Sequence, residues 1–498
     1  MASKLIGIDV GTSRAKTVLI DGSGDVISTA TCSHPTYMPD SFRREQNAED
    51  WWHGTVANIR QMLSESSVPP GEVAGISLSG QGCACQPVSR DGEPLGKAII
   101  WTDERAHAEQ RRVREIFGGD LGGVTGNDIY DQPEPRMMWL REHEPARYSD
   151  TDCFMTTVSY LILKLTGKRA ANHSDWGFHL SFDRKRLDWN EEFVGAVGLS
   201  TDKFPPLAAP TTIIGGVSEW AAAQTGLKAG TPVVAGGQDS TVSALAVGAL
   251  SPGQSVYMRG TTDLISICTD RADYAPGLYT TCAVLPGLFM NYDMSEVIAA
   301  GGSITWLAQR LYHRTGTEVY KEIDRLSEGT PPGASGVIFL PYLLISTNPD
   351  PAMQRKGGLY GLSISSADGD LCRAVMEGSA FALREAIERM ASAGINPTEL
   401  RATGGPTQSD IWNRITVDVT GLPMILPVAR AGAAYGAALL AGLGVGIYPL
   451  DDNYATLKRV IKLSGSVEPD MQRHAAYEAV YAAFCRLAHA TRGLQSPG

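Results

Sequence analysis

The stretch LIGIDVGTS at residues 5–13 decides the predicted fold. Its apolar run ends in the carboxylate of Asp9 and is followed by a glycine turn that carries two hydroxyl side chains. A second apolar run occupies residues 17–20, and a further turn contains Gly24. Extended apolar runs separated by short glycine turns are typical of β-hairpins. We therefore expect the chain to open with two consecutive hairpins.

The same order of elements returns near the middle of the chain. Residues 255–258 form an apolar run, the turn Gly260-Thr261-Thr262 follows, and residues 264–268 are again extended in character. The agreement lies in the order of the elements and not in matching letters. We expect two halves that share one architecture.

The length of 498 residues exceeds what one hydrophobic core usually organises. We predict two α/β domains of roughly 250 residues each, 1–250 and 251–498, with ligands bound in a cleft between them. The formal net charge of -11 gives no reason to expect a nucleic acid as partner. A polyanionic nucleotide would then be held by local devices, such as glycine turns, backbone N–H groups and a metal ion.

The N-terminal sequence MASKLIGIDVGTS has neither a basic segment nor the apolar segment of a secretory signal, which predicts a cytoplasmic protein. A charge-free stretch at residues 432–450 is rich in Gly and Ala and contains Pro449. We interpret it as a buried helix and turn, so no membrane segment is expected. The eight cysteines include no CxxC pair and are too sparse for a zinc site.

Other elements follow from apolar periodicity and capping signals. Residues 150–215 are predicted to be mixed helix and loop without chemistry. The remaining predictions are helices at residues 47–65 (with Asn47 as N-cap), 371–390, 409–420 and 471–491, strands at 73–78, 97–101 and 232–235, and a charged helix beginning near Asp103.

A kinase that acts on an alcohol needs donors for the phosphates, a carboxylate for the metal and a base for the hydroxyl proton. The turn Gly11-Thr12-Ser13 after Asp9 and the turn Gly260-Thr261-Thr262 offer such donors twice. Taken singly, each is also compatible with an ordinary hairpin turn. The chain contains no GxxxxGK[ST] loop and no strand-GxGxxG-helix unit, which disfavours the P-loop and dinucleotide folds.

Asp239 follows two glycines at the end of an apolar strand, so its carboxylate should face a cleft. Two roles are open for it, a catalytic base and the N-cap of a helix that starts at Ser240. The turn Gly404-Gly405-Pro406 is compatible with close approach to a ligand and with a simple strand-to-helix turn.

Together these residues resemble the FGGY family of carbohydrate kinases over essentially the whole chain. The most specific stretch is Gly357-Gly358-Leu359-Tyr360-Gly361-Leu362, followed after seven residues by DLCRAVME at 370–377, which resembles the family's C-terminal signature. Residues 9–13 and 260–262 resemble its two phosphate motifs, and Gly404-Gly405 through Gln408-Ser409, Trp412 and Asp418 resemble its adenosine-side motif.

The resemblance implies an actin-like, ribonuclease-H-like fold of two α/β domains, with the acceptor bound mainly by residues 1–250 and ATP mainly by 251–498. It implies Asp239 as the catalytic base and Mg²⁺ near Asp9 and Asp239. The residues expected to contact the nucleotide are Asp9, Gly11, Thr12, Ser13, Gly260, Thr261, Thr262, Gly404, Gly405, Gln408 and Ser409. Those expected to contact the acceptor are Gln81, Gly82, Cys83, Trp101, Asp103 and Asp239.

Two departures from the family pattern concern the acceptor. Members that act on xylulose usually have Met-His after the Ser-Gly-Gln turn, whereas this chain has Gly82-Cys83, which predicts a smaller pocket without a ring donor. The glycine is more similar to L-pentulose and erythritol kinases, although those often have a large aromatic residue near Cys85. Arg136 stands where the N-terminal signature has Lys, a change that we expect to affect packing only.

The expected activity is ATP-dependent phosphorylation of a small sugar or polyol. Ketopentose, tetritol, pentitol and glycerol-like acceptors stay open, as does the oligomeric state, for which a homodimer is one option. Two rival functions are an actin-like ATPase or phosphatase that uses water and a sugar-sensing regulator without catalysis. The retained Asp9, Asp239 and Gln81-Trp101 polar platform favours the kinase.

Overall fold

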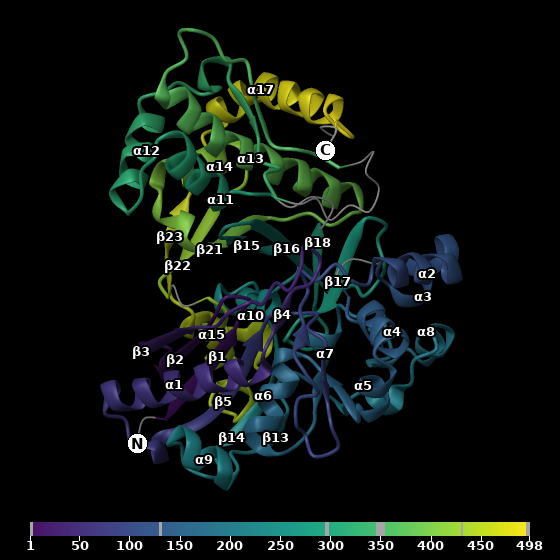
Figure 1. Cartoon of the computed structure of the whole chain (residues 1–498). Helices are drawn as coiled ribbons and strands as arrows, with labels where there is room; N and C mark the ends of the chain where they lie inside the picture. The colour runs from purple at the N-terminus through teal and green to yellow at the C-terminus, as the bar shows by residue number, and fades with distance from the viewer. Residues whose placement is uncertain (1–2, 129–131, 294–297, 345–353, 430–431, 495–498) are drawn as a thin grey trace. The chain divides into compact units, whose positions relative to one another are not determined.

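The structure is a computed structural model and describes residues 3–128, 132–293, 298–344, 354–429 and 432–494 (Figure 1). The chain divides into two compact units. The first comprises Met1–Pro252, Cys268–Met290 and Ala429–Lys462, and the second comprises Gly253–Ile267, Asn291–Val428 and Leu463–Gly498. Two segments beyond residue 250 thus fold with the N-terminal part of the chain.

The first unit is built on a six-stranded sheet. The predicted opening hairpins are confirmed, because β1, β2 and β3 pair antiparallel in sequence. β5 lies parallel to β1, β14 lies parallel to β5, and β13 closes the edge antiparallel to β14. In spatial order the strands are β13 (Ile213–Gly216), β14 (Pro232–Gln238), β5 (Val73–Gly80), β1 (Lys4–Val10), β2 (Arg14–Asp21) and β3 (Val26–Ser33).

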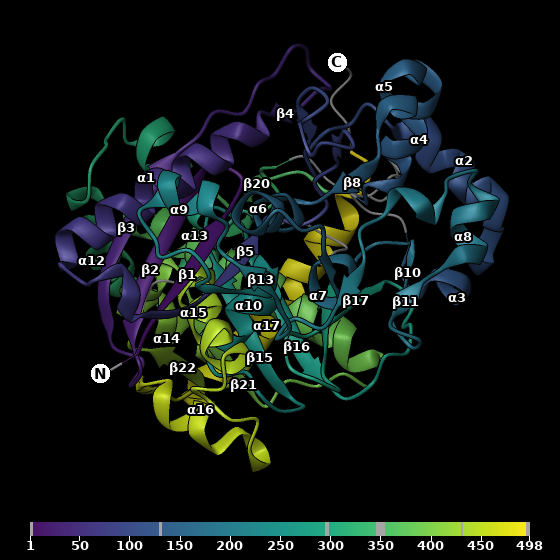
Figure 2. The ribbon, with the colours of Figure 1, turned by 90° about the horizontal axis from the view of Figure 1, so that it is seen from below.

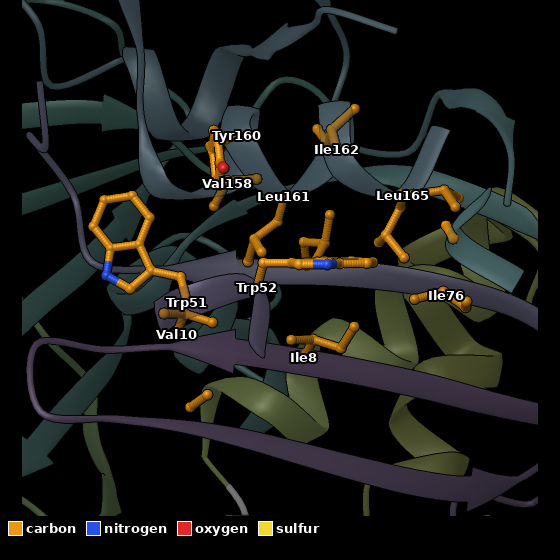
Figure 3. Close-up of a cluster of buried hydrophobic side chains, with 14 of the residues drawn as sticks. Ile8, Val10, Trp51, Trp52, Ile76, Val158, Tyr160, Leu161, Ile162 and Leu165 are labelled. Atoms are coloured by element: carbon orange, nitrogen blue, oxygen red, sulfur yellow. The ribbon is translucent and has the colours of Figure 1, made fainter. Parts of the chain in front are cut away.

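Helices α1 (Ala48–Ser66) and α6 (Thr157–Thr166) cover one face of this sheet. The predicted cap of α1 is confirmed, since the Asn47 side chain accepts from the N–H of Glu49. Figure 3 shows the indole of Trp52 lying flat between the α6 side chains and the sheet residue Ile8. This dry layer of large side chains stabilises the sheet that carries the site.

The opposite face of the sheet is covered by α15 (Ala433–Gly444) and α10 (Asp239–Ala246). The prediction of a buried helix in the charge-free stretch is confirmed, because α15 is buried along its length. Among the residues that the structure describes, no helix combines the length and apolar character needed to cross a bilayer.

The rest of the first unit consists of short elements, many of which contribute to a separate apolar cluster. The predicted strand at 97–101 is shortened to two residues, and the predicted charged helix starts four residues later than Asp103. The elements are β4 (Glu45–Gln46), β6 (Gln86–Val88), β7 (Ala98–Ile99), α2 (His107–Phe117), α3 (Leu121–Thr125), α4 (Glu134–His143), α5 (Pro145–Asp150), β8 (Cys153–Met155), α7 (His173–Trp176), α8 (Glu191–Ala196), α9 (Glu219–Thr225) and β17 (Leu278–Cys282).

The second unit repeats the pairing plan of the first. Its sheet contains, side by side in Figure 2, β16 (Asp263–Thr269), β15 (Gln254–Arg259), β21 (Glu399–Thr403) and β22 (Met424–Pro427), followed by β23 (Leu463–Val467). The β15–β16 pair is an antiparallel hairpin, β21 and β22 continue in parallel, and β23 is antiparallel. This is the order found in β2, β1, β5, β14 and β13, so the predicted shared architecture is confirmed.

The helices of the second unit pack around a second core. They are α11 (Gly301–Trp306), α12 (Glu318–Glu328), α13 (Asp368–Ser392), α14 (Asp410–Thr420) and α17 (Met471–Ala490). The ring of Phe381 on α13 contacts Tyr477, Tyr481 and Phe484 of α17 at centroid distances of 5.8, 6.0 and 5.4 Å. The closing helix is therefore a packing helix, as its apolar face predicted.

Candidate active site

Two carboxylates lie at one edge of the first sheet. Asp9 is near the end of β1, and Asp239 follows directly after β14. Both strands are parallel to β5, so their carboxyl ends share an edge, and Asp9 and Gly237 both pair in register with Ser79. The Ser79 hydroxyl donates to Asp9 Oδ1 at 3.0 Å. The topology thus brings together two residues that are 230 positions apart in the chain.

Burial and mutual repulsion determine the protonation of these carboxylates. Burial and, to a smaller extent, the negative charge of Asp9 together raise the pKa of Asp239 to about 7. Burial also raises the pKa of Asp9, although the Ser79 hydrogen bond and the charge of Lys16 oppose this. A carboxyl group with a pKa near neutrality suits proton transfer, and the excess negative charge suits a cation.

The interpretation of Asp239 as a helix N-cap is wrong. Helix α10 begins at Asp239 itself, and its N-cap is Gln238, whose side chain accepts from the N–H of Ser240 at 3.1 Å. Gln238 Nε2 also donates to Asp239 Oδ1 at 2.7 Å. The carboxylate of Asp239 is therefore held by its neighbour and does not itself cap the helix.

Helix α7 supports the segment that carries Asp239. The backbone N–H of Gln238 donates to Ser174 Oγ at 3.3 Å. The carbonyl of Ala235, earlier in the same strand, accepts from Nδ2 of Asn172, the N-cap of α7, at 3.2 Å. The region between residues 150 and 215, predicted to be without chemistry, thus holds the end of β14.

The same helix carries a third acidic residue, Asp175, which the sequence did not single out. Its side chain is completely buried and accepts a hydrogen bond from the Thr156 hydroxyl. Burial raises the pKa of Asp175 to about 7, and its charge contributes to the raised pKa of Asp239. Three carboxyl groups therefore interact electrostatically within this unit.

The predicted phosphate turn, residues 11–13, is closed by a backbone hydrogen bond from Gly11 N to the carbonyl of Arg14 at 3.1 Å. Thr12 Oγ1 accepts from Trp101 Nε1 at 2.9 Å, so the hydroxyl proton of Thr12 stays available for another acceptor. Ser13 is exposed. The structure thus joins Thr12 to Trp101, which the sequence had assigned to the acceptor.

The predicted acceptor loop, residues 79–83, crosses the same edge of the sheet. Gln81 is buried, its N–H donates to the carbonyl of Val10 at 2.9 Å, and its Nε2 donates to Gln46 Oε1 at 2.7 Å. Gly82 lies against Gln238, because a Cβ added there would be 3.1 Å from Cγ of Gln238. The structure therefore brings the acceptor loop to the residue that holds Asp239.

Asp103, predicted to contact the acceptor, is buried and engaged by protein groups. Its Oδ2 accepts from the N–H of Arg44 at 2.6 Å, and Arg105 donates to both of its oxygens at 2.8 Å. The geometry favours a structural ion pair that shapes the loop after Trp101.

Arg136 contributes more than packing, and the expectation for this residue is wrong. Its buried guanidinium donates from Nη1 to the carbonyl of Cys83 at 3.1 Å and from Nη2 to the carbonyl of Trp101 at 2.6 Å. One side chain thus ties together the two loops that the sequence assigned to the acceptor. A lysine offers a single nitrogen and lacks this forked geometry.

In the second unit, the turn 260–262 is closed by a hydrogen bond from Gly260 N to the carbonyl of Thr262 at 2.9 Å. The start of α11 packs on this turn, with Gly301 N donating to the carbonyl of Gly260 at 3.0 Å and Gly302 N to that of Thr261 at 2.9 Å. Thr261 and Thr262 are exposed. The Gly301-Gly302 pair was missed by the sequence interpretation, although its double glycine was a visible signal.

The double-glycine turn packs against the same hairpin. Gly404 has φ +108°, and a Cβ there would lie 1.8 Å from the carbonyl oxygen of Arg259, so only glycine fits. Among the described residues, no atom lies within 4 Å of a Cβ added at Gly405. Gln408 is exposed. Turns 260–262 and 404–405 therefore adjoin within one unit.

Three further residues of the adenosine-side motif have partners within the protein. Ser409 caps α14 by accepting from the N–H of Trp412 at 3.2 Å, and it donates to Asp324 at 2.7 Å. Trp412 is buried, and Asp418 accepts from Arg473 at 2.6 Å. Their side chains position the turn, which leaves Gly404, Gly405 and Gln408 as the exposed part of the motif.

Comparison with known proteins decides the family. The N-terminal domain of the FGGY family of carbohydrate kinases matches residues 4–246, and the C-terminal domain of that family matches residues 256–445. The chain belongs to the FGGY family of carbohydrate kinases. It is an ATP-dependent kinase that binds a small sugar, and its two-domain α/β fold is the actin-like fold of the family.

Individual relatives agree with this assignment. A xylulose kinase from Bacillus subtilis (strain 168) is 29% identical over 480 residues, covering 96% of this chain and 95% of the relative. An L-xylulose/3-keto-L-gulonate kinase from Escherichia coli (strain K12) is 28% identical over 507 residues, covering 100% and 99%. The crystal structure of xylulose kinase from Rhodospirillum rubrum superposes with a TM-score of 0.88 at 26% identity, covering 97% and 98%.

These matches confirm the predicted family, fold and enzyme class, and they give no support to a water-dependent hydrolase or a non-catalytic regulator. Four residues that lie beside the predicted site residues or support them were missed by sequence reasoning, namely Asp175, Gln46, Ser174 and Gly301. The first three are single polar residues outside any glycine turn, and only tertiary contacts reveal them.

Proposed function

We propose that this FGGY kinase transfers the γ-phosphoryl group of ATP to a hydroxyl of a ketopentose, with xylulose-type sugars as the first candidates and Asp239 as the general base. The observation that carries the assignment of the base is the raised pKa of Asp239 beside Asp9, at the edge of the sheet next to the acceptor loop. A base with a pKa near 7 is matched to a reaction at neutral pH.

The proposed role of Asp239 is to accept the proton of the attacking hydroxyl while the sugar oxygen bonds to the γ-phosphorus and ADP leaves. Gln238 Nε2 restrains Asp239 Oδ1, which limits rotation of the carboxylate. Thr12, with its hydroxyl oriented by Trp101, would donate to a phosphate oxygen. Positioning of this kind accounts for much of the catalysis of phosphoryl transfer.

We infer that Mg²⁺ accompanies the nucleotide near Asp9 and Asp239. The donor set fits a hard cation, since both groups are carboxylates whose mutual repulsion a positive charge would relieve. When bound, Mg²⁺ neutralises charge on the transferred phosphoryl group. The turns 260–262 and 404–405 are proposed to contact the phosphates and the adenosine through backbone N–H groups and through Thr261 and Thr262.

The class of acceptor is inferred from two observations, one of which favours a ketose and the other a smaller polyol. The relatives named above act on xylulose or L-xylulose and 3-keto-L-gulonate, which favours a ketose. The small loop at Gly82-Cys83 favours compact acceptors and leaves a tetritol or pentitol as the second candidate. A coupled assay of ADP release over D-xylulose, L-xylulose, D-ribulose, ribitol, erythritol and glycerol separates them.

We expect a ketopentose to release ADP far above the water background. A polyol with a higher kcat/KM than any ketose would replace the proposed acceptor by the second candidate. Failure of every sugar and polyol to exceed the background would refute the proposed substrate class. Omission of Mg²⁺ with a chelator should abolish turnover, and full turnover without divalent cation would contradict the metal assignment.

A further inference from the structure

Arg259 is a buried cation that lies beside two turns of the second unit. It is the last residue of β15, so the 260–262 turn follows it directly. Its carbonyl oxygen would be 1.8 Å from a Cβ added at Gly404, so the 404–405 turn packs against the same residue. The backbone of Arg259 therefore adjoins both turns that are proposed to bind the nucleotide.

The side chain of Arg259 is joined by hydrogen bonds to the 404–408 segment, which contains the 404–405 turn. Its Nη1 donates to Asn413 Oδ1 at 2.6 Å, and Asn413 Nδ2 donates to the carbonyl of Thr407 at 2.9 Å. A guanidinium can only donate and a carbonyl can only accept, so the amide of Asn413 has a single possible orientation. A chain of two hydrogen bonds thus runs from the end of β15 to the 404–408 segment.

Two aromatic rings restrain the guanidinium of Arg259. Its central carbon is 4.7 Å from the ring centroid of Trp412 and 5.3 Å from that of Tyr257. Trp412 is fixed in turn, because its Nε1 donates to Ser379 Oγ at 3.2 Å. Cation–π contacts are strongest where water is excluded, as it is at this buried position. The guanidinium is therefore held by its rings as well as by Asn413.

Stability alone gives little reason for an arginine at this position. Within the described part of the chain, its Nε and Nη2 have no hydrogen-bond partner. Asp263, which pairs in register with Arg259 across the β15–β16 hairpin, interacts with it electrostatically. An apolar residue of similar volume often stabilises a protein as much as a buried charge or more. A directional link between the two turns, in contrast, requires a hydrogen-bond donor.

We propose that Arg259 is a positioning residue that fixes the distance between the 260–262 turn and the 404–408 segment, so that one nucleotide can engage both at once. The inference rests on the proposed assignment of these turns to the phosphates and the adenosine. Two sites held at the right separation bind a molecule that spans them more tightly than two sites that move independently. Arg259 acts through Asn413 and through its own backbone, so its buried side chain does not have to contact the nucleotide.

The test compares a ligand that spans both turns with ligands that occupy one of them. The spanning ligand is the magnesium complex of a non-hydrolysable ATP analogue, and the two fragments are adenosine and magnesium tripolyphosphate. Arg259→Met keeps a long side chain without its charge and donors, and we expect it to bind the analogue roughly 10- to 30-fold more weakly. Each fragment should lose no more than about 2-fold in affinity, and the acceptor KM should stay constant.

The conservative variant Arg259→Lys retains a donor for Asn413 and should restore binding of the analogue to within about 3-fold of the unchanged enzyme. Calorimetric titration measures all of these affinities. A fragment that loses as much affinity as the analogue would show local damage to its turn and would overturn the proposal. Unchanged binding of the analogue to Arg259→Met would overturn it as well.

Asn413→Ala breaks the same chain at its other member and serves as a second variant if Arg259→Met does not fold. It should weaken binding of the analogue to a similar extent. Because the two residues act as a unit, the double variant should match the weaker single variant within about 2-fold. Losses that multiply in the double variant would overturn the link through Asn413.

A matched control is Arg384→Met in the same unit. Arg384 also lies over an aromatic ring, at 4.1 Å from the ring centroid of Tyr481, and it donates to the carbonyl of Val419 near the other end of α14. This variant should bind the analogue and both fragments like the unchanged enzyme. A loss of analogue binding equal to that of Arg259→Met would overturn the specific role of Arg259.

A measurement without nucleotide separates this proposal from the proposed function. The N–H of Ser409 closes the 404–408 segment by donating to the carbonyl of Pro406 at 3.1 Å. Its hydrogen exchange with solvent should be at least 10-fold faster in Arg259→Met and unchanged in Arg384→Met. Equal exchange rates in Arg259→Met and the unchanged protein would overturn the positioning role. Failure of both fragments to bind the unchanged protein would refute the proposed nucleotide contacts, and the exchange rates would then decide the positioning role by themselves.

Discussion

Gln238 caps helix α10 and at the same time donates a hydrogen bond of 2.7 Å to Asp239 Oδ1. The residue that caps the helix is thus also the residue that orients the proposed base. Since Gln238 is in turn held by Ser174, the geometry at Asp239 is determined by the fold around it. This arrangement allows the role of the carboxylate to be tested without disturbing the helix.

Replacement of Asp239 by Asn should lower kcat by roughly 10²- to 10⁴-fold, because the amide cannot accept the hydroxyl proton. The acceptor KM should change little, since Asn has the size of Asp. Steady-state kinetics with the best acceptor measure both quantities. Asp188→Asn, an exposed replacement in the same unit, should keep full activity. Near-full turnover of Asp239→Asn would show that another group is the base.

The activity should depend on pH through the same group. A base must be deprotonated to act, and burial together with Asp9 raises the pKa of Asp239 to about 7. We therefore expect kcat/KM to rise with pH through about 7 and to level off above it. A profile of kcat/KM from pH 5.5 to 9 at constant ionic strength checks this. A flat profile over that range would contradict the assignment.

The free energy of unfolding should decrease as the pH rises, because Asp175 is buried. Burial raises its pKa from 3.8 in the unfolded chain to about 7 in the folded one, so the folded state favours the protonated form. The contribution of Asp175 to the free energy of unfolding is complete below pH 3.8 and decreases as the pH rises to about 7.

Asp175→Asn removes that dependence while it can still accept from Thr156. Above pH 7.5 the variant should be more stable than the unchanged protein by about 1 to 3 kcal/mol, and near pH 4 the difference should vanish. Denaturant unfolding at several pH values measures it. A difference that does not depend on pH would contradict the buried carboxyl group as its cause.

Much of the fold was predictable because it is encoded in local patterns. The hairpins at residues 5–20 and 255–268 appear in the sequence as apolar runs with glycine turns, and both form as predicted. The sequence patterns did not predict that Cys268–Met290 and Ala429–Lys462 belong to the first unit. They depend on packing between segments far apart in the chain, for which no local signal exists.

For the candidate site too, features encoded in local sequence patterns could be predicted, and features that depend on long-range contacts could not. Glycine turns and their carboxylates are recognisable because their backbone conformation restricts the residue type, as Gly404 illustrates. The hydrogen bond from Arg136 to Trp101 and that between Gln46 and Gln81 each join residues 35 positions apart in sequence, which no local pattern reveals. The ion pair between Asp103 and Arg105 was likewise not predictable from the sequence, and the ligand contact expected of Asp103 stays a prediction.

Arg136→Lys tests how the two acceptor loops are held together. Lysine is the residue of the family signature at this position, but its donors all lie on one nitrogen, whereas Arg136 reaches the carbonyls of Cys83 and Trp101 from two separate nitrogens. We expect the acceptor KM to rise about 3- to 10-fold with a smaller effect on kcat. Arg141→Lys, on the same helix and also donating to a carbonyl, serves as control and should leave KM unchanged. An unaltered KM in Arg136→Lys would show that the loops keep their shape without the fork.

Two neighbouring glycines, Gly404 and Gly405, allow the effect of this turn on folding to be tested separately from its effect on nucleotide binding. Gly404→Ala forces a Cβ to within 1.8 Å of the Arg259 carbonyl at φ +108°, so it should lower the free energy of unfolding by roughly 2 kcal/mol or more.

Gly405→Ala adds a methyl group that has no atom of the described part of the chain within 4 Å, so the free energy of unfolding should stay within about 0.5 kcal/mol of that of the unchanged protein. If the nucleotide approaches the backbone here, the same methyl group should raise the KM for ATP several-fold while the acceptor KM stays constant. Denaturant unfolding and nucleotide kinetics on both variants decide between the two requirements. A Gly405→Ala enzyme with unchanged KM for ATP would mean that the nucleotide keeps clear of this turn, and Gly404 would then be required only for folding.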